Sequence, residues 1–134
     1  MSASRELQVM IYDRLVADAG VHAIVADRIY DARPVDGAFP CITFGPSSFL
    51  PEDYECIAGR VETIQLDCWS EDQGRLNPCK DLVDAVKDAL HLFDGALTIN
   101  ALVSLELEQA RVFIDQDGIT AHGVVVFTAL IEEN

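Results

Sequence analysis

The hydrophobic positions near the start of the chain repeat with the period of a helix. Four apolar residues follow the i, i+3, i+4, i+8 spacing that places side chains on one helical face: Leu7, Met10, Ile11 and Leu15. Ser4 is available as the N-terminal cap, and Ala19-Gly20 offers a stop. The pattern therefore predicts an amphipathic helix, and the apolar piece Val21 to Ala26 fits one further helical turn.

Alternating patterns in the first half of the chain predict two strands. The strand expected from Cys41 to Phe49 is interrupted at Gly45-Pro46, and proline there favours an edge position or a bulge. From Arg60 to Trp69 apolar and polar residues alternate, which is typical of a strand with one buried face. The acidic segment from Pro51 to Gly59 is expected to connect them.

The second half repeats this order. Asn77-Pro78 favours the start of a second amphipathic helix, which should end at Asp94-Gly95. In the next strand the apolar positions change phase near Glu108-Gln109, which indicates a bulge. A turn at 115–118 then leads to a last strand, Thr120 to Ile131, that is apolar on both faces.

Together these elements predict a single α+β domain over residues 1–134. The order is helix, two strands, helix, two strands, giving a four-stranded, mainly antiparallel sheet with two amphipathic helices on one face. The second face carries more apolar residues than a solvated face needs. Either self-association covers it or the segment from Pro51 to Gly59 folds over it, and the sequence favours neither.

The net charge of the chain limits which classes of partner it can bind. The chain has 23 acidic and 9 basic residues, a formal net charge of −14, which would repel a phosphate backbone. Specific nucleic-acid binding is therefore not expected. No segment approaches the length of a membrane span, so no membrane partner is expected either.

Motifs for catalysis, cofactors or metals are not found. The four cysteines are each more than ten residues apart, which excludes the short paired spacings of zinc and redox sites. Gly45 to Phe49 lacks the final glycine of a nucleophile elbow, and the three histidines share no spacing. We expect neither an enzyme nor a resident cofactor, and Cys41 and Cys68 are expected to be reduced core thiols.

Several short segments resemble those of a known family. They are an N-terminal helix, Arg28 to Asp31 followed by Pro34, Phe39 to Gly45, Leu66 to Ser70, Ala89 to His91, and Asp117 to Gly123. In this combination the chain resembles the tail-terminator, or tail-completion, proteins of long-tailed phages and gene transfer agents. The resemblance runs nearly end to end, and the proline-rich loop and the final hairpin carry most of it.

The resemblance implies a structural virion protein. Such a subunit would form a ring with copies of itself, expected to be a hexamer, that caps the tail tube, ends tail elongation and joins the tail to the head or its connector. Its partners would be the tail tube protein and a head connector or adaptor protein, and DNA would pass through the ring. The protein would be made in the bacterial cytoplasm and incorporated at the head-tail junction.

Two sets of residues are candidates for these contacts. The irregular loop before Cys41 is expected to be an arm that contacts a neighbouring subunit or the tube, through Arg28, Tyr30, Arg33, Pro34 and Phe39. Acidic residues in two turns are expected to face the lumen or the tube, where they would keep DNA from sticking: Glu52, Asp53, Glu55, Asp115 and Asp117.

A different class of function stays open at this point. The chain could be a small α+β ligand-binding or regulatory domain, with the segment from Arg28 to Gly45 as the rim of a pocket and a dimer formed across the second sheet face. A small enzyme is a more distant alternative, because no nucleophile is paired with a base.

Overall fold

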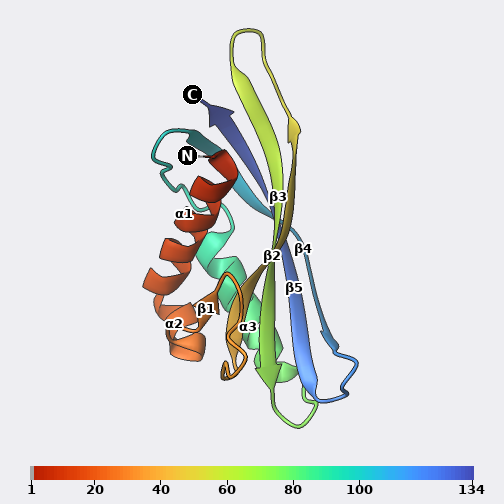
Figure 1. Ribbon diagram of the computed structural model, residues 1–134. Coiled ribbons are helices and arrows are strands. Elements are labelled where there is room, and N and C mark those ends of the chain that lie inside the picture. The colour runs from red at the N-terminus through yellow and green to blue at the C-terminus, as the bar shows by residue number, and fades with distance from the viewer. Residues whose placement is uncertain (1) are drawn as a thin grey trace.

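Residues 2–134, which the computed structural model describes, form three helices and a five-stranded sheet (Figure 1). The helices are α1 (Ala3–Ala17), α2 (Ala19–Val25) and α3 (Asn77–Leu90), and the strands are β1 (Ile29–Tyr30), β2 (Cys41–Pro51), β3 (Ala58–Glu71), β4 (Ala101–Ile114) and β5 (Thr120–Glu133). The strand order is β1-β2-β3-β5-β4. All neighbouring strands are antiparallel except β1 and β2.

The predicted α+β class, the mainly antiparallel sheet and the placement of the helices on one face are confirmed, but the numbers of strands and helices were wrong. The additional strand, β1, has two residues and pairs in parallel with Ile42 and Thr43. Two residues are too few to show an alternating pattern. The additional helix, α2, begins at Ala19, where the sequence indicated a stop. The Asp18 side chain caps this helix by accepting a hydrogen bond from the Val21 N–H at 3.0 Å.

The helix starts also differ from prediction by a residue or two. Ser2 caps α1 by accepting from the Arg5 N–H, while Ser4 donates its hydroxyl to Glu62, 2.8 Å away. Leu76 stands at the N-cap of α3 without a side-chain cap bond, and Pro78 lies in the first turn. Proline there costs no hydrogen bond, since the first N–H groups of a helix have no partner inside it.

The pairing of β3 with β5 runs without interruption from Ala58 opposite Glu133 to Glu71 opposite Thr120. Both outer pairings are irregular. The register of β2 shifts between Phe44 and Ser47, and that of β4 shifts between Leu107 and Gln109, which confirms both predicted bulges. A further shift between Leu102 and Ser104 was not predicted.

The core lies between the sheet and the helices. On the helix-covered face, β5 contributes Val125, Phe127 and Ile131, all fully buried, and β3 contributes Leu66 and Cys68. Two buried carboxylates fasten α1 to its surroundings. Glu62 of β3 accepts from Ser4, and Glu6 of α1 accepts from the Ile99 and Asn100 N–H groups, which lowers the pKa of Glu6.

Both sheet edges are partly closed. Along β4, the Leu107 N–H donates to His91 Nδ1 at 2.9 Å, and the Leu105 carbonyl accepts from the Leu92 N–H at 2.8 Å. Along β2, the short strand β1 covers the first residues, and the rest of the edge contains Pro46 and Pro51. Proline cannot donate to an incoming strand, so part of each edge is blocked from pairing.

Helix α3 packs closely on β5 at Gly123, where an added Cβ would lie 2.5 Å from Val83 Cγ2. We expect Gly123→Ala to lower the free energy of unfolding by about 1–3 kcal/mol, because α3 would have to move off the sheet. The control is Gly20→Ala in α2, where the new Cβ would meet only the Asp18 side chain at 3.3 Å. Urea unfolding measures both variants; equal midpoints would contradict this account of the packing.

Candidate functional site

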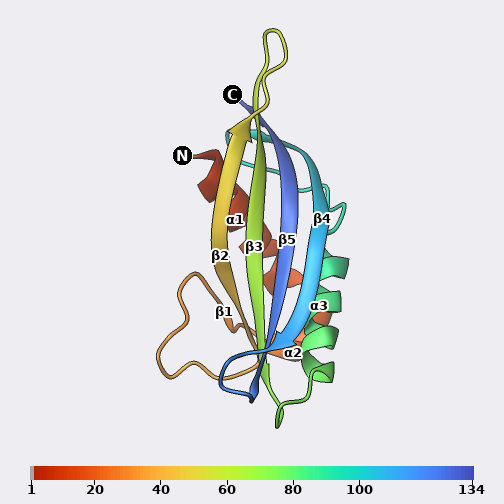
Figure 2. The same ribbon diagram turned by 90° about the vertical axis from the view of Figure 1, so that its right-hand side faces the viewer.

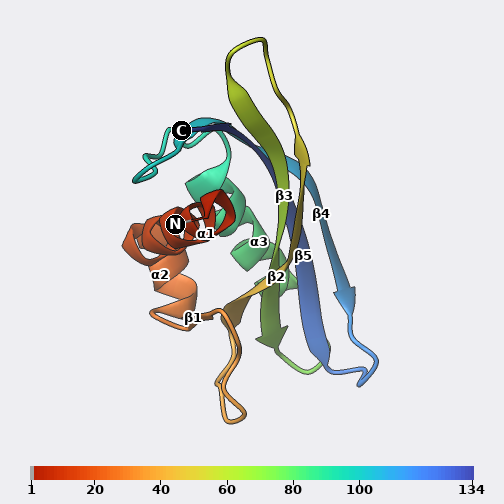
Figure 3. The same cartoon turned by 45° about the horizontal axis from the view of Figure 1, so that its top comes forward.

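One face of the sheet carries no helix and is exposed along its length (Figure 2). The segment from Pro51 to Gly59, expected as a possible cover, is the tip of the β2–β3 hairpin and extends beyond the end of the sheet (Figures 1 and 3). It leaves a row of apolar side chains along the centre of this face without a cover from the described residues: Val61, Val124 and Val126, all half-buried. We call this surface the open face.

A cluster of rings occupies one end of the open face. His122 lies between Trp69 and Phe113, with ring centroids 3.9 Å and 4.9 Å away, and its Nε2 is 2.7 Å from Asp67 Oδ1. Trp69 donates from Nε1 to Thr43 Oγ1 at 3.0 Å. These bonds fix a rigid aromatic platform.

The glycine at the β2 bulge makes room for this cluster. A Cβ on Gly45 would lie 2.7 Å from Asp67 Oδ2. No sequence motif predicts the cluster, although the alternation between Arg60 and Trp69 places Asp67 and Trp69 on the same face of the strand. What was missing was the register that sets His122 opposite Trp69.

The loop between β1 and β2 is braced at both ends. Arg28 donates from Nε to the Pro40 carbonyl at 2.7 Å and from Nη2 to the Ile24 carbonyl at 3.3 Å. Arg33 donates to the Gly37 carbonyl and its guanidinium lies 4.4 Å from the centre of the Phe39 ring. Between these contacts Val35 is 96% exposed.

The structure therefore separates the candidate arm residues into two groups. Arg28 holds the base of the loop, and Tyr30 lies in β1 opposite Thr43. Arg33, Pro34 and Phe39 belong to the loop itself, beyond that base. All five stay predictions as contact residues.

The candidate acids lie at opposite ends of the sheet. Arg33 and Phe39 share a shallow pocket with Trp69, Asp115 and Asp117, so one pair of acids adjoins the arm. The other three, Glu52, Asp53 and Glu55, lie on the β2–β3 hairpin at the far end (Figure 1). The 14 residues of β3 separate the two groups by about 45 Å.

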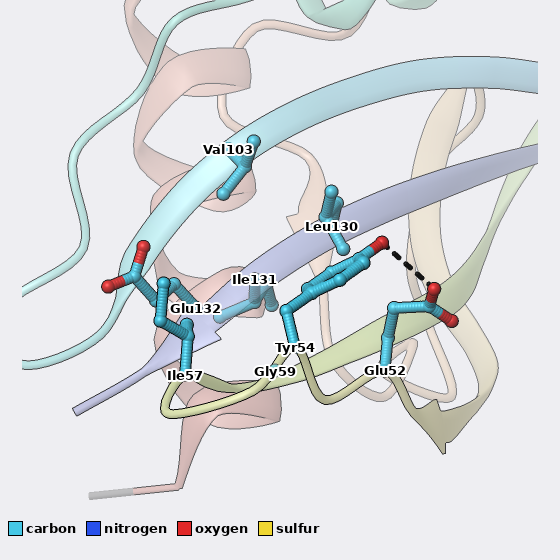
Figure 4. A pocket seen from close by; sticks show the side chains of 8 residues that line it. All are labelled: Glu52, Tyr54, Ile57, Gly59, Val103, Leu130, Ile131 and Glu132. Atoms are coloured by element: carbon cyan, nitrogen blue, oxygen red, sulfur yellow. Dashed lines mark hydrogen bonds between the residues drawn. The ribbon is translucent and has the colours of Figure 1, made fainter.

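An apolar pocket lies where the β2–β3 hairpin meets β4 and β5 (Figure 4). Its lining consists of Glu52, Tyr54, Ile57, Gly59, Val103, Leu130, Ile131 and Glu132. The Tyr54 hydroxyl donates to Glu52 at 2.9 Å, and this carboxylate raises the pKa of Tyr54. We call this recess the hairpin pocket. No sequence pattern predicts it, because its lining comes from three strands and a loop.

The cysteines fall into a buried and an exposed class. Cys41 and Cys68 are buried free thiols, as expected, and so is Cys79, whose pKa is raised by burial to about 11. Cys56 is exposed at the hairpin tip. Within residues 2–134 no group of three metal-ligating side chains comes together. Nor does that part of the chain contain a helix long and apolar enough to cross a membrane.

Comparison with known proteins identifies relatives. The family model described as tail completion protein gp17 matches residues 9–132. Among solved structures, a chain from the virion of a native gene transfer agent particle superposes with a TM-score of 0.89 at 26% sequence identity, and the match covers 98% of each chain. The comparison with curated proteins found no match.

Asp117 is bound within its own turn, which yields a prediction that separates it from Asp115. Its carboxylate accepts from the Ile119 and Thr120 N–H groups, both at 2.8 Å, and from the Thr120 hydroxyl, and these bonds lower its pKa. We expect Asp117→Ala to speed hydrogen exchange at Ile119 and Thr120 severalfold, and Asp115→Ala to leave it unchanged.

The same exchange measurement has a pH dependence. Because the folded-state pKa of Asp117 is depressed, the protection should be present at neutral pH and be lost as pH falls through that pKa, below the usual range of an aspartate. Equal exchange in both alanine variants would contradict the assigned role of the Asp117 carboxylate.

Proposed function

Because the chain belongs to the tail completion protein gp17 family, a family of phage tail structural proteins, we propose that it forms a ring that caps the tail tube, ends tail elongation and joins the tail to the head or its connector. The family match over residues 9–132 carries the proposal. The likeness in fold to a chain of a gene transfer agent virion supports incorporation into a phage-like particle at the head-tail junction.

The shape of the subunit suits a joining role. The hairpin and the hairpin pocket lie at one end of the long sheet, and the β1–β2 loop and the β4–β5 turn lie at the other (Figure 1). One end would meet the tail tube protein and the other the head connector or adaptor protein. The whole chain would act as one domain, and it would work by surface complementarity, without a chemical step.

The acidic residues support passage of DNA through the ring. Glu52, Asp53 and Glu55 are carried on a hairpin that projects from the sheet, where they would add negative potential to a lumen without being needed in the core. A negative lumen opposes the accumulation of a polyanion on the wall. The ligand-binding alternative has less support, since the family is one of tail structural proteins.

Removal of the gene tests termination directly. We expect cells that lack this protein to produce tails of uncontrolled length and heads without tails, because nothing would cap the tube at its proper end. Electron microscopy of particles measures both features, and expression of the chain from a plasmid should restore normal particles. Normal joined particles in the deletion would overturn the proposal.

Charge reversal tests the lumen. We expect lysine at Asp53 and Glu55 together to reduce DNA delivery by about tenfold or more while joined particles still form, because a basic wall would retain the DNA. The matched control is lysine at Asp84 and Asp88 on α3, the same change in charge on the helix side. Unchanged delivery in the hairpin variant would count against the acidic lumen.

A further inference from the structure

We propose that Val35 of one copy inserts into the hairpin pocket of the neighbouring copy, with Arg33 facing the carboxylates at the rim of that pocket. The inference rests on the proposed ring and names the two surfaces that would build it. One surface is an exposed apolar side chain on a braced loop, and the other is an apolar recess with an acidic rim.

Val35 differs from the other apolar side chains on the surface. It is 96% exposed, whereas the remaining exposed large hydrophobic residues range from 40% to 73%. Pro34 fixes the backbone before it. Because Arg28 and Arg33 tie the loop to the Pro40 and Gly37 carbonyls, the loop is held away from its own core and presents Val35 outward.

The hairpin pocket has the complementary properties. Tyr54, Ile57, Val103 and Leu130 supply apolar walls, and none of these side chains is fully buried by its own chain (Figure 4). Glu52 and Glu132 supply two carboxylates. An apolar group with a cation beside it therefore fits the pocket, and Arg33 lies two residues before Val35.

Within the loop, Arg33 is the group that fits the acidic rim of a second copy of this chain. It is the only cation between Asp31 and Pro40, and the Asp31 carboxylate accepts from Gln8 at 2.9 Å. Asp36 follows Val35, so the loop must enter with Arg33 toward the rim carboxylates and Asp36 turned away from them. The guanidinium has five N–H donors, so the bond to Gly37 leaves others for the rim carboxylates.

The two surfaces occupy diagonal corners of the sheet and cannot meet within one chain. The loop enters β2 at Cys41, opposite Trp69, whereas the pocket lies level with Arg60, which is opposite Ile131. Nine residues of β3 separate these levels, about 30 Å. Between copies, a contact of unlike surfaces is head-to-tail, and such an interface closes into a ring when the rotation between neighbours returns to its start.

Covalent cross-linking tests the contact, because Cys56 is the exposed thiol next to Ile57. In Val35→Cys, a short bis-maleimide should link position 35 of one copy to Cys56 of the next, giving dimers and a ladder of larger cross-linked species. The sample is the purified protein if the protein self-associates, and otherwise purified particles. The ladder should disappear in Val35→Cys/Cys56→Ser. Val9→Cys, at a position on α1 that is 47% exposed, is the matched control and should give none above the wild-type background.

A second pair of variants measures the strength of the contact. Val35→Asp should weaken self-association by about tenfold or more in sedimentation experiments, and Val35→Ile should preserve it, because only the first loses the apolar contact. Arg33→Glu should also weaken association, and adding Glu132→Arg should restore part of the loss.

The outcomes separate this inference from the proposed function. The inference is overturned, and the ring left intact, if mass measurement shows a ring but position 35 does not link to Cys56. A linkage from position 35 to a different protein has the same meaning. A monomer in solution together with normal particles in the gene deletion overturns the proposed function as well.

Discussion

The uninterrupted pairing of β3 with β5 is the interaction on which the remaining structure depends. Both strands have 14 residues, and each residue of one has a partner in the other. The outer strands β2 and β4 are bulged, so the irregularities of register are confined to the two sides of this central ladder. The ladder sets the length of the molecule and keeps the surfaces at its two ends far apart.

The two faces of the sheet differ in what packs against them. On one face, small residues such as Gly123 allow α3 to pack closely, and the buried carboxylates of Glu6 and Glu62 tie α1 to the sheet and to the segment before β4. On the open face, apolar side chains remain half-buried and the aromatic cluster around His122 is stabilised by polar bonds. The helices therefore stabilise one face of the sheet, and they leave the open face and both ends of the sheet uncovered.

Local patterns predicted most of the fold, because they depend on neighbours in sequence. The bulge near Glu108 was visible as a change of phase, and that at Gly45-Pro46 as a proline inside a strand. β1 was missed because two residues show no periodicity. The apolar piece Val21 to Ala26 indicated a further helical turn, but the start of α2 at Ala19 was not predicted, because the cap at Asp18 depends on one side-chain bond. The site was less accessible: the hairpin pocket and the cluster around His122 arise from register between distant strands, which composition and spacing do not encode.

The closed edges of the sheet limit how copies of this chain can assemble. A free edge accepts one strand after another at the same spacing, and such growth has no built-in end, as in fibrils. Here His91 and Leu92 occupy the middle of the β4 edge, and β1 and two prolines occupy much of the β2 edge. In the proposed ring, copies would therefore contact one another mainly through side chains, and the angle that those contacts set between neighbours would determine the number of copies.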